Sequence, residues 1–195
     1  IAQRQGFKGV RWMKMTDPDA MEAPSKVGSF LIWQQPHLIH LAELVYRATN
    51  DEAVLRNYYD LVMKTAEFMY SFATYDEAND RYILKGIIAA QETLRASENV
   101  NPPMELSSWH YGLSTAQLWR ERMGEPRVAE WDTLLAKLSP LAKDAEGKLY
   151  LASEDATDSY TNIRFISDHP AVTGALGMYP ESRLLDKEIM NNTID

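Results

Sequence analysis

Apolar residues recur along much of the chain with the period of an α-helix. Over residues 36–49 they lie three and four positions apart, and Pro36 stands in the first turn, where its missing N–H leaves no hydrogen bond unmade. Thr49 and Glu52 then have the spacing of a capping box, which predicts that a second helix begins at once. Two long helices joined by so short a turn form an antiparallel hairpin. The stripes expected to face the core are Leu38, Leu41, Ala42 and Val45 in the first helix, and Leu55, Tyr58, Tyr59, Val62, Ala66 and Met69 in the second.

A second helix pair is predicted after a long interruption. Residues 74–86 lose the helical period, residues 81–84 suggest a short extended stretch, and a loop follows up to Pro103. The next two helices are expected over 104–123, ended by Gly124, and over 127–138, ended near Pro140. The stripe of the latter is Val128, Trp131, Leu135 and Leu138.

The two ends of the chain carry weaker patterns. Residues 1–28 are rich in glycine and proline and predict an irregular segment. Residues 141–167 are mixed, with a small hairpin expected over 147–152, and a third, shorter helix pair is expected over 170–178 and 184–190. The predicted fold class is therefore all-α, a set of αα-hairpins with short extended excursions in the loops. We treat residues 1–195 as a single unit, an irregular segment (1–28) followed by helix pairs and loops (29–195).

Composition narrows the functional classes. The chain has 195 residues with 45% hydrophobic and 25% charged residues, as in ordinary globular domains. Its formal net charge of -8 and the lack of a Lys/Arg cluster argue against nucleic-acid binding. Its apolar runs are too short to cross a bilayer, so we expect no membrane insertion. The absence of cysteine excludes disulfides and thiolate chemistry but leaves the compartment, cytoplasmic or periplasmic or secreted, open.

Common catalytic and cofactor motifs are missing as well. The sequence contains no G-x-S-x-G, H-E-x-x-H, Walker or dinucleotide fingerprint, and we expect no cofactor. His37, His40 and Glu43 stand three residues apart, but on a helix their side chains fan over about 120° and do not converge. We therefore expect no metal site.

Glu92 is the most suggestive carboxylate, because it ends the apolar run 87–91. An acid there is expected to be desolvated, which raises a carboxyl pKa toward the range of a general acid. The alternative is that Glu92 only anchors its loop by accepting backbone hydrogen bonds. A glycosidase needs a second carboxylate facing the first across the sugar, and the sequence does not single one out. The other loop acids are Asp17, Asp19, Glu22, Glu98 and Glu105.

Tryptophans are candidates for stacking on sugar rings, but they also fill cores. Trp119 and Trp131 fall on helical stripes and are expected in the core. Trp12, Trp33 and Trp109 are the candidate sugar platforms.

Several motifs, taken in order, resemble the (α/α)6 catalytic barrel of the maltose and trehalose phosphorylase family and of its hydrolytic relatives, such as the glucosylgalactosyl-hydroxylysine glucosidase. The motifs are GFKGVRW (6–12), IWQQPH (32–37), TAEF (65–68), AQE (90–92), NVN (99–101) and DHP (168–170). The resemblance implies that Glu92 is the general acid that protonates the glycosidic oxygen. It also implies a carbohydrate substrate bound by Lys8, Arg11, Trp12, Lys14, Trp33, Gln34, Gln35, His37, Gln91, Asn101 and Glu105.

Two departures from the family pattern bear on the activity. Gln91 stands where the family has an acid, and Met13 where it often has a proline, so the sugar preference need not follow the relatives. The resemblance further implies that closing hairpins lie beyond Asp195 and that the chain is about half of a barrel. The first residue, Ile1, agrees with a fragment of a longer protein. An unclosed barrel is expected to expose an apolar flank that promotes self-association.

Three functions follow as hypotheses. The first is an inverting glycoside hydrolase with Glu92 as general acid. The second is an inverting phosphorylase, in which phosphate replaces water. The negative net charge of the chain, and the lack of an evident phosphate-binding loop of backbone N–H groups, favour hydrolysis. The third, from another class, is a non-catalytic helical module that binds glycans.

Overall fold

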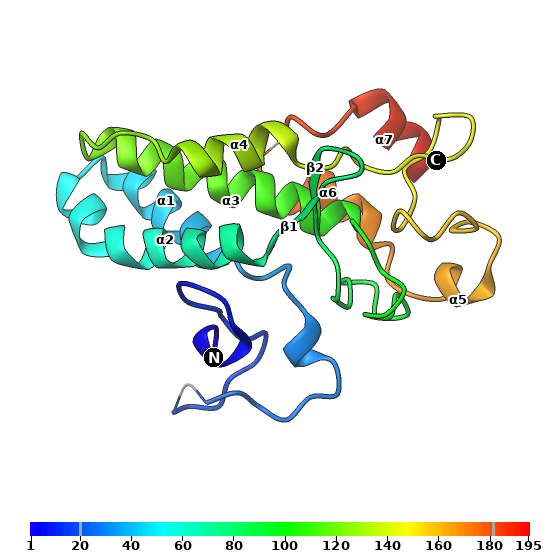
Figure 1. The fold of residues 1–195 in the computed structure, drawn as a ribbon, viewed down its shortest axis with the longest axis horizontal. Helices are drawn as coiled ribbons and strands as arrows, with labels where there is room; N and C mark the ends of the chain where they lie inside the picture. The colour runs from blue at the N-terminus through cyan, green and yellow to red at the C-terminus, as the bar shows by residue number, and fades with distance from the viewer. Residues whose placement is uncertain (20, 181) are drawn as a thin grey trace.

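Two helix hairpins form the main body of the molecule. The structure, a computed structural model, describes residues 1–19, 21–180 and 182–195. Helices α1 (His37–Thr49) and α2 (Glu52–Phe72) form the first hairpin, and α3 (Pro103–Arg122) and α4 (Ala129–Lys137) form the second. The hairpins lie side by side, with the N-terminal segment beneath them in Figure 1. The first two predicted helix pairs are thus confirmed, and the chain is predominantly helical.

Short elements complete the described fold. The only sheet among the described residues is an antiparallel pair, β1 (Thr74–Asp76) and β2 (Arg81–Ile83), with Tyr75 opposite Tyr82. The others are the 3-10 turns η1 (Gln3–Gln5), η2 (Gly28–Phe30) and η3 (Ala171–Thr173), and the helices α5 (Ile163–Ile166), α6 (Gly174–Gly177) and α7 (Lys187–Ile194). The sequence indicated the second strand but not its partner.

Some predicted local features are wrong. The cap of α2 is Asp51, whose carboxylate accepts the Ala53 N–H at 2.8 Å, while the Thr49 hydroxyl donates to the Val45 carbonyl instead of forming a capping box. The hairpin expected over 147–152 is shifted: Lys143 bridges Tyr150, and the Leu151 N–H donates to the Ala142 carbonyl at 3.0 Å. The third helix pair is present with shifted bounds. Its first member is η3 followed by α6, over 171–177, and its second is α7, which begins later than predicted because the Asp186 carboxylate caps it there.

Helix α1 buries a different face from the one predicted. Its buried residues are Ile39, Ala42 and Glu43, whereas Leu41 is 53% exposed and Val45 is exposed as well. The reason is that α1 packs on α2 and α3 through the face that carries Glu43, which pairs there with Arg122 and with the buried indole of Trp119. An apolar stripe is therefore left on the outer surface of α1.

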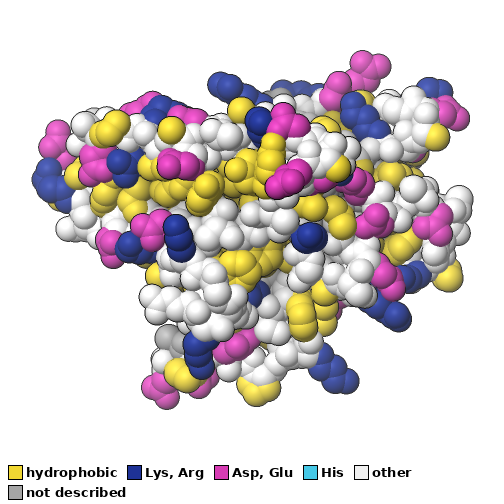
Figure 2. Space-filling view, viewed as in Figure 1, with side chains coloured by type: hydrophobic (Ala, Val, Ile, Leu, Met, Phe, Trp, Pro, Cys, Tyr) yellow, Lys and Arg dark blue, Asp and Glu magenta, His cyan; other side chains and the backbone are white. Residues whose placement is uncertain are grey.

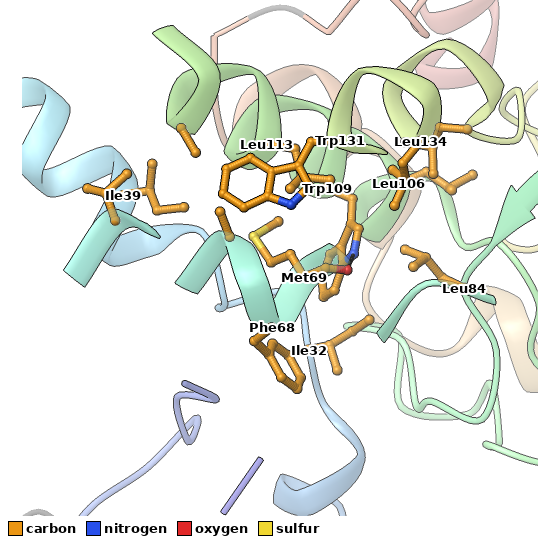
Figure 3. Packing of buried hydrophobic residues seen from close by; sticks show 14 of the residues in the cluster. Ile32, Ile39, Phe68, Met69, Leu84, Leu106, Trp109, Leu113, Trp131 and Leu134 are labelled. Atoms are coloured by element: carbon orange, nitrogen blue, oxygen red, sulfur yellow. Dashed lines mark hydrogen bonds between the residues drawn. The ribbon is translucent and has the colours of Figure 1, made fainter. Parts of the chain in front are cut away.

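Helix α3 is the centre of the core. It contacts α1, α2, α4, α6 and η3, and every residue from Pro103 to Trp109 is buried. Trp109 is fully buried and its indole N–H donates to the Met69 carbonyl at 2.8 Å, so this tryptophan is a core residue and the prediction of a sugar platform is wrong. Trp119 and Trp131 are buried as predicted. Figure 3 shows buried residues from α1, α2, α3 and α4 meeting around Trp109.

A buried carboxylate ties α1 to α3. The side chain of Glu43 is only 1% exposed; Arg122 reaches it at 2.5 Å, Arg47 at 2.6 Å, and the Trp119 indole N–H at 2.7 Å. Burial alone would raise the pKa of Glu43, but the hydrogen bonds from Arg122, Arg47 and Trp119 outweigh it and lower the pKa. The two hairpins are thus joined by charge as well as by apolar packing.

We expect Glu43→Gln to lower the free energy of unfolding by about 1.5–3 kcal/mol, the worth of hydrogen bonds to a charged group. The control is Glu52→Gln, since Glu52 is 82% exposed and its pair with Arg56 should contribute less than about 1 kcal/mol. Urea unfolding at neutral pH measures both variants. Equal losses in the two variants would contradict the proposed role of Glu43.

Because the pKa of Glu43 is lowered in the folded protein, the free energy of unfolding depends on pH. The stabilisation by Glu43 is fully present above its ordinary pKa of 4.5, and it is lost as the pH falls through the lower pKa of the folded protein. The difference between wild type and Glu43→Gln should therefore shrink in acid.

Candidate active site

The segment before α1 is docked along α2. The Val10 N–H donates to the Lys64 carbonyl at 2.9 Å, and the Trp12 indole N–H donates to the Thr65 hydroxyl at 2.9 Å. Gly9 makes this approach feasible: its φ is +65°, and a Cβ there would lie 2.1 Å from the Lys64 carbonyl oxygen. The segment predicted to be irregular is thus held in one position against a helix.

Two buried glutamines fix the same segment to the turn before α1. Gln35 binds Trp12 on both sides, accepting its backbone N–H at 2.8 Å and donating to its carbonyl at 2.7 Å. Gln34 donates to the same carbonyl at 3.1 Å. Both ends of the Gln35 amide bind the backbone of Trp12, which gives this residue a structural role. Gln34 donates only through its amide nitrogen, and its side-chain oxygen has no hydrogen-bond partner among the described residues.

Arg11 is also buried. Its guanidinium donates to Gln5 at 2.7 Å and to the carbonyls of Ser29 and Leu31. Burial lowers the pKa of Arg11, with the charge of Glu22 opposing the shift. Arg11 therefore links the N-terminal turn to the segment before α1.

The loop that leads to Glu92 is anchored by side chains from later in the sequence, at every third position. The Leu84 N–H donates to Asn101 at 2.9 Å, and the Ile87 carbonyl accepts from Asn99 at 3.1 Å. Further along, the Ala90 N–H donates to Glu105 at 2.8 Å, and the Thr93 N–H to Asp168 at 2.8 Å. Gln91 adds a hydrogen bond to the Phe165 carbonyl at 2.9 Å. These bonds give the backbone on both sides of Glu92 a defined position.

The carboxylate of Glu92 points outward from this loop. Its side chain is 41% exposed, and the ammonium of Lys14, 78 positions earlier, lies 3.2 Å from it. The expectation that Glu92 is desolvated is wrong, because the anchors bury the backbone of the loop and leave the side chain at the surface. The structure does bring together Lys14 and Glu92, two residues that the resemblance places in the site.

Glu105 is the desolvated acid of this region. It is fully buried in the first turn of α3, one carboxyl oxygen accepts the Ala90 N–H, and the other has no hydrogen-bond partner among the described residues. Burial raises the pKa of Glu105 to about 7, although the N–H groups of Ala90 and of Glu105 itself act in the opposite direction. The sequence offered no sign that this acid, and not Glu92, is the buried one.

Asp168 is the anchor on the far side of Glu92. Burial would raise its pKa, but the N–H groups of Thr93 and His169 outweigh it, so the pKa is lowered. Arg164 also donates to the Thr93 carbonyl. Asp168 and Asn99 were not among the predicted site residues, although both lie in motifs that carry the resemblance.

Aromatic and imidazole rings gather beside the start of α1. His37 lies 5.3 Å from Trp33, centroid to centroid, and is hydrogen-bonded to the Tyr179 hydroxyl; His40 bonds the Tyr111 hydroxyl at 2.7 Å. Burial lowers the pKa of both histidines and raises the pKa of both tyrosines, so the group is neutral at pH 7. Trp33 and His37 are half-buried, which leaves part of their surface for a ligand.

The remaining predicted residues lie elsewhere. Lys8 lines a separate hollow of about 390 Å³ with Glu67, Tyr70 and Trp131. Asn101 is fully buried between Leu84 and Glu154, so it supports the loop and does not face a ligand.

Among the described residues no group of His, Asp or Glu side chains could hold a metal ion. On the face shown in Figure 2, acidic and basic side chains are interspersed.

Comparison with known proteins adds no assignment to this geometry. No protein-family model matches the chain, and no curated protein matches it. Within the described part of the chain, no helix has the length and apolar character needed to span a bilayer.

We expect Gly9→Ala to loosen the first segment from α2, because the new methyl group would meet the Lys64 carbonyl. Gly6→Ala is the matched control: Gly6 also has a positive φ, +84°, but open space around it. Both variants should carry the strain of a left-handed alanine, and Gly9→Ala should lose about 1–3 kcal/mol more of unfolding free energy. Thermal unfolding followed by tryptophan fluorescence measures this, and equal losses would show that the close approach is unimportant.

Proposed function

We propose that this chain is part of a glycoside hydrolase that cleaves a glycosidic bond with inversion, with Glu92 as the general acid. The observation that carries the proposal is the exposed carboxylate of Glu92 on a loop whose backbone is anchored at Leu84, Ile87, Ala90 and Thr93. A general acid must touch its substrate and must keep a fixed geometry while it transfers a proton. Glu92 meets both requirements. To donate a proton it must be in its acid form, so its ion pair with Lys14 has to open when the substrate binds.

Lys14 beside Glu92, and the rings of Trp33 and His37 at the start of α1, are groups of the kind that bind carbohydrates. Lys14 lies within hydrogen-bond distance of Glu92 and offers donors to sugar hydroxyls. Trp33 and His37 present half-buried ring surface of the kind on which the apolar face of a pyranose packs. The carboxylate that activates water in an inverting mechanism is a separate requirement, and we assign no residue to it.

We further propose that the helix pairs belong to an (α/α)6 barrel. In such a barrel each hairpin is flanked by others, so a hairpin at an open flank carries apolar residues on its outer face. Helix α1 has this character, since Leu41, Leu44 and Val45 are all exposed.

Replacing Glu92 by glutamine should lower the release of reducing sugar from α-linked glucosides by about 10²–10⁴-fold, the usual contribution of general acid catalysis. The matched control is Glu98→Gln, an exposed acid of the same loop whose partner is Arg164. The assay uses a panel of α-linked glucosides with the longest form of the protein that contains this chain, and circular dichroism checks that both variants fold.

Omission of inorganic phosphate from this assay distinguishes the alternatives. Release without phosphate is the expected result, whereas a strict requirement for phosphate would identify a phosphorylase. Binding of glucosides with no turnover in either condition would favour a glycan-binding module. Full activity of Glu92→Gln would contradict the role of Glu92.

The exposed face of α1 should also promote self-association of the isolated chain, because it places three large apolar residues side by side in water. Leu41→Lys combined with Leu44→Lys should shift the chain toward monomer in sedimentation velocity. Ile163→Lys is the control, since Ile163 is 73% exposed but lies on α5. A wild-type chain that stays monomeric at 100-fold higher concentration would contradict this expectation.

A further inference from the structure

Glu105 has an unusual environment for a carboxyl group. It is fully buried, and no salt bridge with a described cation is formed. Buried acids are normally paired or hydrogen-bonded through both oxygens, because an unpaired buried charge is strongly unfavourable. Among the described residues, the one hydrogen bond that the Glu105 carboxyl group accepts from another residue comes from the backbone N–H of Ala90, two residues before Glu92.

The other anchors of the loop differ from Glu105 in one respect. Asn99 and Asn101 come from the same loop region, and Asp168 comes from the segment after α5, whereas Glu105 belongs to the central helix. Every residue of α3 from Pro103 to Trp109 is buried, so a side chain in its first turn is held by the core. The hydrogen bond between the Glu105 carboxyl group and the Ala90 N–H therefore fixes the loop relative to the core.

We propose that Glu105 is a positioning residue, which holds the turn at Ala90 and thereby sets where the Glu92 carboxylate lies. This inference rests on the proposed function for its effect on catalysis but not for its effect on the loop. It also differs from what the family resemblance implies, namely that Glu105 faces the sugar. A side chain with no exposed surface does not reach a ligand in this conformation.

Two substitutions of Glu105 distinguish the role of its hydrogen-bond acceptor from the role of its negative charge. Glu105→Gln keeps a carbonyl oxygen that accepts the Ala90 N–H, and Glu105→Leu fills a similar volume without any acceptor. Gln117→Leu is the control, because Gln117 is fully buried on the same helix but binds Val128 and Asp132 near α4. Amide hydrogen exchange of the peptide 87–94, measured by mass spectrometry, reports the loop without any need for activity.

Glu105→Leu should speed exchange of this peptide about fivefold to tenfold, the effect of losing roughly one hydrogen bond. Glu105→Gln should restore near-wild-type exchange, and Gln117→Leu should leave this peptide unchanged. With maltose as the probe, whose sugar leaving group departs only when it is protonated, Glu105→Leu should lower kcat up to about 100-fold with little change in KM, since a misplaced acid slows the chemical step. Glu105→Gln should rescue kcat.

Exchange in the peptide 87–94 that is unchanged in Glu105→Leu, or equally fast in Gln117→Leu, would overturn the proposal. A wild-type protein without turnover would count against the proposed function alone, because the exchange result still decides the role of Glu105. If Glu105→Leu does not fold, Ala90→Pro decides instead, because proline removes the N–H that Glu105 accepts. Exchange in the rest of the peptide 87–94 should then be faster than in wild type, and unchanged exchange would overturn the proposal.

Discussion

The burial of the first half of α3 is the constraint on which the rest of the structure depends. Every residue from Pro103 to Trp109 is buried, so polar side chains on this part of the helix have only protein groups to bind. Trp109 bonds the Met69 carbonyl, Gln117 binds the turn before α4, and Glu105 binds the loop at Ala90. The polar groups of α3 thus connect the core to α2, α4 and the candidate active site.

The same arrangement explains why the site is formed by irregular segments. The segment at Gly9 is fixed by α2, and the loop before Glu92 is fixed by Glu105 and Asp168. Neither segment has the regular backbone hydrogen bonds of a helix or strand. Side chains from distant residues bind their backbone N–H and C=O groups instead. Lys14 and Glu92 meet at the surface because both segments are anchored to the same helical body.

The sequence predicted the helices well and their orientation less well. Helical periodicity located all four long helices, since it depends on local spacing. It failed for the buried face of α1, because Leu41 and Val45 are as apolar as core residues and only the partners of Glu43 determine which face is buried. A resemblance carried by short motifs indicated Lys14 and Glu92. It could not indicate that Gln34 and Gln35 bind backbone groups, which depends on three-dimensional contacts.

The central claim is that the anchored loop presents Glu92 to a glycosidic bond. The most direct measurement is a crystal structure of the protein with a sulfur-linked glucoside, which binds like a substrate but resists cleavage. The account predicts that the bridging sulfur lies within about 4 Å of a Glu92 carboxyl oxygen, the hydrogen-bond reach for the larger sulfur atom. A sugar bound away from the loop, with Glu92 still paired to Lys14, would contradict it.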